Sequence, residues 1–284
     1  LLYGTEEGAS YLSSLGRAAG FGSERIRKLK YQLIQEGTYQ WILRVRATTS
    51  LGHRSMCMVV AKDARGFSRT AAREYELLGV LRKRNPEKVV RDLGSHSIPI
   101  EVGGTPSRLF VYWTAWLSGY MELGMNEKHR FGLIGAEDVK MLTRKQGEVV
   151  RGELLEVLAS LYEAAGRSAL IDVQVNSGDF MLRLSSGRPE AMLIAARVLR
   201  SGLSPLGLLR GLLSGKGELG EEQVLLNPSS PAAVVKRLIA GLSVALGGEE
   251  QGHRFVRKAL KAAVRTKEPS PAGPFEWDDL LKYV

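Results

Sequence analysis

The strongest constraint on the fold is a change of hydrophobic pattern near Ser118-Gly119. Before this point, apolar residues run in short blocks rich in β-branched and aromatic side chains, which is typical of strands. After it, apolar residues recur mainly at helical spacing. With 284 residues, of which 44% are hydrophobic, the chain can form a core in each part. We therefore predict an α+β protein with a β-rich first part and a mainly helical second part.

Three strands are predicted at the start of the β-rich part. Residues 31–35 alternate between polar and apolar side chains, and residues 39–47 are rich in aromatic and β-branched side chains. These two segments predict a hairpin with Gly37 at or near its turn. Residues 56–63 are almost continuously apolar, which is typical of a strand covered on both faces.

A helix and two more strands complete the β-rich part. Apolar residues recur at helical spacing over 69–84, and Asn85-Pro86 ends this helix. Residues 98–102 and 108–117 flank a glycine-containing turn and predict two strands. The first 117 residues therefore predict three strands, one helix and two strands, in that order.

The second part carries several helical patterns and one short hairpin. The helical patterns cover residues 146–165, 205–213, 231–246 and 251–265. The predicted domains are a helical extension over 1–30, a β-rich lobe over 31–118, a helical lobe over 119–267, and a linker with a tail over 268–284.

A polar loop precedes the predicted hairpin. Asp172, Asn176 and Asp179 interrupt two apolar runs, and these side chains can bind a metal ion or accept a proton. Residues 180–184 and 191–196 then predict the two strands of the hairpin, joined by a turn that contains glycine and proline.

The composition limits the classes of partner. The formal net charge is +10 and the sequence pI is about 9.7, so the surface attracts polyanions, and we predict weak polyanion binding. The single cysteine, Cys57, forms no intrachain disulfide. No apolar run approaches the roughly 20 residues that span a bilayer, and no signal peptide opens the chain. These observations favour a cytoplasmic location.

The order of elements resembles the protein-kinase-like fold, and its small-molecule branch of aminoglycoside and lipopolysaccharide kinases most of all. The resemblance covers about residues 30–200, and rests on the five-stranded lobe with one helix, the linker, and the helical lobe with a polar loop and hairpin. It implies a bilobal protein with a small antiparallel-sheet N-lobe and a mainly helical C-lobe. It also implies ATP and Mg²⁺ as cofactors.

The resemblance assigns nucleotide-binding residues in the first lobe. Lys62 ends the strand Val59-Val60-Ala61-Lys62, where the family holds nucleotide phosphates with a lysine. Glu74, on the following helix, is the implied ion-pair partner of Lys62. Gly37 lies in the implied phosphate-covering loop, and residues 108–119 resemble the strand and hinge that cradle adenine.

In the second lobe the resemblance assigns catalysis and metal binding. Asp172 is the implied base for the acceptor hydroxyl, and Asn176 the implied metal ligand. Ala195 stands where the family has a magnesium-binding aspartate. Asp179, at the start of the hairpin, is our candidate substitute for that ligand.

Three functions remain open on the sequence. The first is an ATP-dependent phosphotransferase that acts on a small molecule or a lipid-linked sugar. The second is a pseudokinase-like scaffold, which the alanine at 195 favours. The third is a basic module that binds nucleic acid or an anionic membrane. The clustering of Asp172, Asn176 and Asp179 in one loop favours the phosphotransferase, because like charges cost stability where they serve no purpose.

Overall fold

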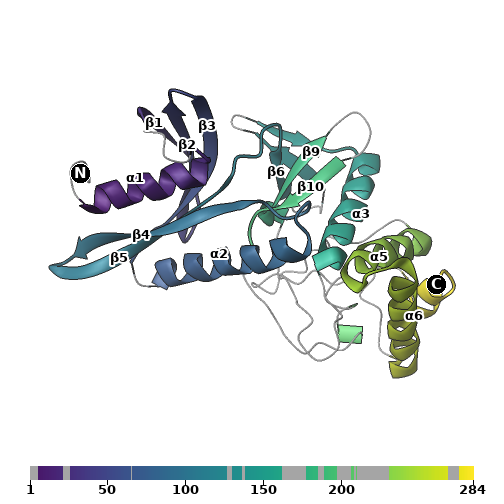
Figure 1. The fold of residues 1–284 in the computed structure, drawn as a ribbon. Coiled ribbons are helices and arrows are strands. Elements are labelled where there is room, and N and C mark those ends of the chain that lie inside the picture. The colour runs from purple at the N-terminus through teal and green to yellow at the C-terminus, as the bar shows by residue number, and fades with distance from the viewer. Residues whose placement is uncertain are drawn as a thin grey trace. The chain divides into compact units, whose positions relative to one another are not determined.

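The computed structural model describes most of the chain as two compact units (Figure 1). The described residues are 6–21, 26–64, 66–126, 130–135, 138–161, 177–184, 189–196, 206–207, 209, 230–267 and 275–284. Unit 1 comprises Leu1–Arg82 and Val90–Ser118, and unit 2 comprises Lys83–Val89 and Gly119–Val284. Each unit contains a five-stranded antiparallel sheet and helices, so the predicted α+β class is confirmed.

Unit 1 is built on a sheet with the strand order β1-β2-β3-β5-β4. Its strands are β1 (Lys28–Glu36), β2 (Gln40–Thr49), β3 (Gly52–Ala61), β4 (Asp92–Val102) and β5 (Thr105–Ala115). The predicted hairpin is confirmed, because β1 pairs with β2 around a turn in which the Gly37 amide donates to the Gln40 carbonyl at 2.9 Å. All five strands and the helix between β3 and β4 follow the predicted order.

Helix α1 (Glu6–Ala19) covers one face of this sheet. Tyr11 and Leu15 of α1 pack into a buried cluster with Met56, Met58 and Trp113. The Tyr11 hydroxyl also donates to the Met58 sulfur at 3.5 Å. The predicted helical extension over 1–30 is therefore corrected: α1 is part of the core of unit 1, and residues 28–30 already belong to β1.

Helix α2 (Gly66–Arg84) packs on the opposite face. Its Tyr75 ring lies 6.2 Å from the Phe110 ring and 5.5 Å from the Tyr112 ring, measured between centroids. The Ser68 hydroxyl accepts the amide hydrogen of Phe110 at 3.1 Å. Tyr112 and Trp113 are neighbours on β5 and point to opposite faces, because side chains alternate along a strand, so α1 and α2 cover different faces.

Unit 2 contains a second sheet with the strand order β10-β9-β6-β7-β8. Its strands are β6 (Met121–Met125), β7 (Phe131–Ile134), β8 (Val139–Met141), β9 (Phe180–Leu184) and β10 (Pro189–Leu193). The predicted hairpin of β9 and β10 is confirmed. The strands β6, β7 and β8 were not predicted, because runs of three to five residues that contain glycine or charged side chains give almost no periodic signal.

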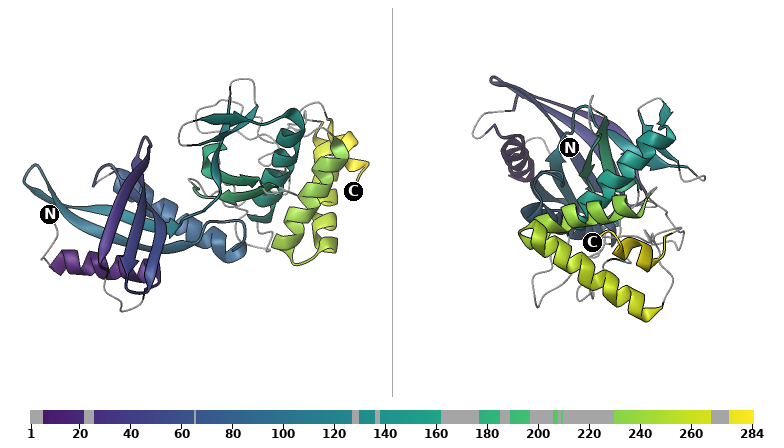
Figure 2. Two further views of the ribbon diagram at one scale, coloured as in Figure 1. Left: turned by 90° about the horizontal axis from the view of Figure 1, so that it is seen from above. Right: turned by 90° about the vertical axis from the view of Figure 1, so that its right-hand side faces the viewer.

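The helices of unit 2 pack against one another through close backbone approaches (Figure 2). They are α3 (Arg144–Leu161), α5 (Pro231–Leu246), α6 (Glu249–Thr266) and the short α7 (Trp277–Leu281). Gly241 of α5 lies against α3, where an added Cβ would come within 2.4 Å of the Ala159 Cβ. Gly252 of α6 lies against α5, where an added Cβ would meet the Ser243 hydroxyl at 2.5 Å. None of the described helices is long and apolar enough to cross a bilayer.

The segment that follows α2 belongs to unit 2. The Asn85 side chain donates to the Ser160 hydroxyl on α3, and the Lys88 ammonium lies 2.6 Å from the Glu153 carboxylate on the same helix. The Leu193 amide donates to the Lys88 carbonyl at 2.9 Å, next to a bridge between Val89 and Leu193. Helix α3 and strand β10 thus hold residues 85–89 within unit 2.

Candidate functional site

Lys62 lies at the turn between β1 and β2. Its amide donates to the Tyr39 carbonyl at 2.9 Å, which fixes the backbone directly after β3. Its ammonium lies 2.6 Å from a carboxylate oxygen of Glu36 and 5.8 Å from the centre of the Trp41 ring. The hydrogen bond from Lys62 lowers the pKa of Glu36 below its usual value. A cation therefore lies beside the turn that contains Gly37.

The predicted ion pair between Lys62 and Glu74 is wrong. Within the described part of the chain, the ion pair of Lys62 is with Glu36. Glu74 is a buried residue of α2, with 6% of its surface exposed, and α2 packs on the face of the sheet that carries Val59 and Tyr112.

Alternation along β3 explains this result. Met58 faces α1, and Val60, two residues later, shares that face. Lys62 continues this alternation, and its ammonium lies near Trp41, which is the cross-strand partner of Val60. Lys62 and the helix that carries Glu74 therefore lie on opposite faces of the sheet.

Gly37 occupies a position that suits glycine. An added Cβ would lie 3.3 Å from the Gln40 carbonyl oxygen, so a larger residue would crowd the turn. The turn pairs the ends of β1 and β2 and places Gly37 next to Tyr39, whose carbonyl holds Lys62. Its role in covering nucleotide phosphates stays a prediction.

Asp179 lies where the sequence predicts, at the start of the β9–β10 hairpin. It is the last residue of a 3₁₀ turn (Ser177–Asp179), and only 1% of its surface is exposed. Its carbonyl accepts the Ile194 amide hydrogen at 2.8 Å, next to Ala195. Asp172 and Asn176, the predicted base and metal ligand, lie outside the described residues. Among the described residues, no three histidine, cysteine or acidic side chains cluster as a metal-binding group.

Glu122 is a second carboxylate near this turn, and the sequence did not predict it. An added Cβ on Gly178 would lie 3.1 Å from a Glu122 carboxylate oxygen. Glu122 reaches this position because β6 pairs with β9, with Glu122 opposite Met181. The sequence could not indicate this proximity, because strand β6, which carries Glu122, was not predicted. Carboxylate oxygens are the ligands that Mg²⁺ prefers, so Glu122 joins Asp179 as a candidate metal ligand.

A polar cluster on the same sheet links β9, β10 and the residue before β6. The Tyr120 hydroxyl and the Arg183 guanidinium both donate to the Glu190 carboxylate. The Arg183 guanidinium also lies 4.9 Å above the centre of the Tyr120 ring. Burial, then the hydrogen bond to Glu190 and its charge, raise the pKa of Tyr120 to about 12. The hydrogen bond from Tyr120 is the largest cause that lowers the pKa of Glu190.

The cluster predicts a loss of stability at high pH. The pKa of Tyr120 rises from 10.0 in the unfolded chain to about 12 in the folded protein, so the unfolded state loses this proton first. The contribution of Tyr120 to the free energy of unfolding is fully present below pH 10 and is lost as the pH rises to about 12. Between these pH values we expect the free energy of unfolding to fall less steeply with pH in Tyr120→Phe than in the unchanged protein. The difference in slope should correspond to the release of up to about one proton on unfolding. Urea unfolding across this pH range checks this, and equal slopes would contradict it.

The structure brings some of the predicted site residues together and separates others. Lys62 and Gly37 meet at one turn of unit 1, Glu74 lies on a helix that covers the other face of that sheet, and Asp179 lies in unit 2. Comparison of the sequence with models of protein families and with curated proteins finds no match. Functional assignment therefore depends on the residues and their geometry.

Proposed function

We propose that the protein is a kinase-like phosphotransferase that uses ATP and Mg²⁺ to phosphorylate a small molecule or a lipid-linked sugar. The observation that carries the proposal is the order of unit 1, five antiparallel strands with a single helix between the third and the fourth. In unit 2, helix α3 precedes a segment whose sequence contains Asp172 and Asn176, and a hairpin that starts at the buried Asp179 follows. The resemblance to protein-kinase-like folds implies this order, except for strands β6, β7 and β8, which precede α3.

The described contacts support specific roles in nucleotide binding. Lys62 offers a cation beside a tight turn, and its partner Glu36 is 60% exposed, so a phosphate can replace this carboxylate without leaving a buried charge unpaired. Gly37 lies in this turn, where the resemblance implies the loop that covers the nucleotide phosphates. Glu74 has no role in this proposal, because α2 lies on the other face of the sheet.

The acidic residues of unit 2 supply the chemistry in this proposal. Asp172 accepts the proton of the attacking hydroxyl as its oxygen bonds to the γ-phosphorus of ATP and the bond from that phosphorus to the oxygen of the leaving ADP breaks. Asn176, Asp179 and Glu122 are the residues that would hold the metal ion, which would neutralise negative charge on the nucleotide phosphates. Glu122 and Asp179 both lie beside the backbone of one turn, at the start of β9.

Nucleotide binding without phosphate transfer is the second candidate. Two observations favour it: Ala195 stands where a metal-binding aspartate is expected, and Lys62 pairs with Glu36 instead of Glu74. A protein of this kind would bind ATP through unit 1 and act as a scaffold. Its ATP affinity would be insensitive to Mg²⁺.

Thermal unfolding with ATP separates these functions. For the phosphotransferase we expect ATP with Mg²⁺ to raise the unfolding temperature, since a ligand at about 100 times its Kd stabilises a protein by about 2.7 kcal/mol. EDTA should remove most of the shift. Lys62→Gln should reduce it, whereas Lys140→Gln, a change of an exposed lysine on β8, should not. An equal shift in EDTA supports the scaffold, and no shift under any condition contradicts both functions.

A further inference from the structure

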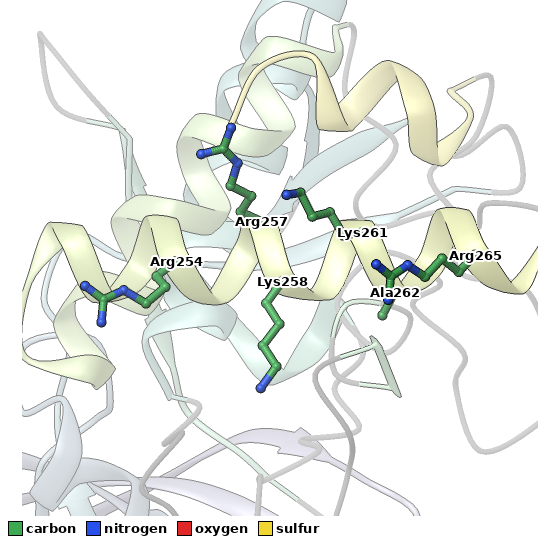
Figure 3. Close-up of a pocket in the computed structure, with 6 residues that line it drawn as sticks. All are labelled: Arg254, Arg257, Lys258, Lys261, Ala262 and Arg265. Carbon is green, nitrogen blue, oxygen red and sulfur yellow. The ribbon is translucent and has the colours of Figure 1, made fainter.

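Helix α6 has one buried face and one exposed face. Gly252, Val256, Ala259, Leu260 and Ala263 are the buried residues, and they recur at helical spacing. The opposite side carries five exposed cations and one exposed alanine. We call this surface the basic face of α6; it consists of Arg254, Arg257, Lys258, Lys261, Ala262 and Arg265 (Figure 3).

Most of these cations have no carboxylate partner within the described residues. Arg254 pairs with Glu250 at 2.5 Å, one turn earlier, and Glu249 lies 3.8 Å from His253. The acidic residues of α6 are therefore confined to its first turn. Arg257, Lys258, Lys261 and Arg265 follow without any acidic residue between them. Four like charges within three turns repel one another, so an anion that binds across them relieves an unfavourable interaction.

The four cations are spread along the helix. An α-helix rises about 1.5 Å per residue, so the row from Arg257 to Arg265 is about 12 Å long. Figure 3 shows Arg257 and Lys261 on one side of the helix and Lys258 on the other. The cations fan out over the surface and do not converge on one point. This arrangement fits an extended polyanion better than a small phosphorylated metabolite, which requires donors that converge.

We propose that the basic face of α6 binds the sugar–phosphate backbone of a nucleic acid, without reading its sequence. Duplex DNA carries one negative charge per about 1.7 Å of its axis, so a row of about 12 Å faces several phosphates at once. Lysine and arginine are the side chains that neutralise phosphates, and the six residues that define the basic face include no amide or hydroxyl side chain.

The burial pattern of α6 favours nucleic acid over a lipid bilayer. A helix that binds in a membrane interface inserts its apolar face into the acyl region. The apolar face of α6 is already buried in unit 2, and the uncharged side chain of the basic face is Ala262. Attraction to a bilayer would be electrostatic only, whereas a nucleic acid presents a far higher linear charge density.

The test compares two variants that each lose two lysines and two arginines. The first changes Arg257, Lys258, Lys261 and Arg265 to glutamine. The matched control changes four exposed cations of unit 1, Lys28, Lys30, Arg46 and Arg54, to glutamine. Binding to a fluorescent duplex of about 20 base pairs is measured by anisotropy from about 50 to about 200 mM salt, a range over which four phosphate contacts weaken binding roughly a hundredfold.

We expect the α6 variant to bind the duplex at least about tenfold more weakly at the lowest salt. The slope of the logarithm of its binding constant against the logarithm of the salt concentration should be smaller in magnitude by about four. The unit 1 control should keep most of the affinity and slope. Circular dichroism and thermal unfolding verify that both variants fold. Equal losses in the two variants would overturn the proposal, because the effect would then come from net charge.

Vesicles of phosphatidylcholine with about 30% phosphatidylserine provide the second arm. If the α6 variant loses vesicle binding while duplex binding is unchanged, the face binds lipid and the proposal is wrong. Unchanged duplex binding without any vesicle effect would also overturn it. Nucleotide binding and phosphate transfer do not enter either arm, so these results are independent of the proposed function.

Discussion

Asp172→Asn should reduce phosphate transfer by about 100-fold or more while leaving the affinity for ATP close to that of the unchanged protein. A positioned base acts in the transition state, so its loss lowers turnover far more than ground-state binding. Asparagine keeps the size of the side chain and removes its ability to accept a full proton. ATP consumption in the presence of candidate acceptors measures the first quantity, and titration with a fluorescent nucleotide measures the second.

Asp278→Asn is the matched control for this experiment. Asp278 is an exposed residue of α7, and the same change of charge there should leave turnover and affinity unaltered. If Asp172→Asn and Asp278→Asn retain equal turnover, Asp172 is not the base. If the unchanged protein binds ATP equally well in EDTA and never consumes it, the protein is a nucleotide-binding scaffold.

Gly241→Ala should destabilise unit 2, although alanine is normally the better residue in a helix. The change from glycine to alanine in a helix interior is worth about 1 kcal/mol in favour of alanine. At Gly241 the new Cβ would come within 2.4 Å of the Ala159 Cβ and within 2.7 Å of the Glu156 carbonyl oxygen. Overpacking of this kind costs about 1–3 kcal/mol, and a backbone carbonyl cannot move aside as a flexible side chain can. We therefore expect a net loss of stability.

Gly79→Ala tests the same substitution without the clash. Gly79 lies inside α2, and apart from its chain neighbours and the backbone of the helix itself, no heavy atom lies within 4 Å of an added Cβ. We expect a gain of about 0.5–1 kcal/mol at this position. Urea unfolding followed by circular dichroism compares the two variants. A Gly241→Ala variant that is as stable as Gly79→Ala would show that α3 and α5 can separate at little cost.

The sequence determined the elements whose signals are local. The hairpin around Gly37, helix α2, helix α5 and the β9–β10 hairpin follow from alternation, helical periodicity and turn residues within single segments. Each of these signals involves neighbours in sequence, so the pattern is sufficient to predict them. The position of Asp179 at the start of the second hairpin belongs to the same group.

Pairing between distant segments needed the tertiary structure. The strands β6, β7 and β8 have three to five residues each, and they become strands by joining a sheet that β9 and β10 extend. The pairing of β6 with β9 carries Glu122 to the backbone of Gly178, 56 residues along the chain. Nothing in the residues around Glu122 encodes this meeting, because strand pairing depends on the whole sheet.

The ion-pair partner of Lys62 also depends on contacts between distant segments of the chain. The sequence determines that Met58 and Val60 share one face of β3, because side chains alternate along a strand, and Lys62, directly after the strand, continues this alternation. Which helix covers that face is decided by packing: α1 takes it, and α2, with Glu74, takes the other. Alternation is a property of a few consecutive residues, whereas the choice of face depends on contacts among segments far apart in the chain. The sequence therefore places Lys62 at the end of its strand, and only the tertiary structure pairs it with Glu36.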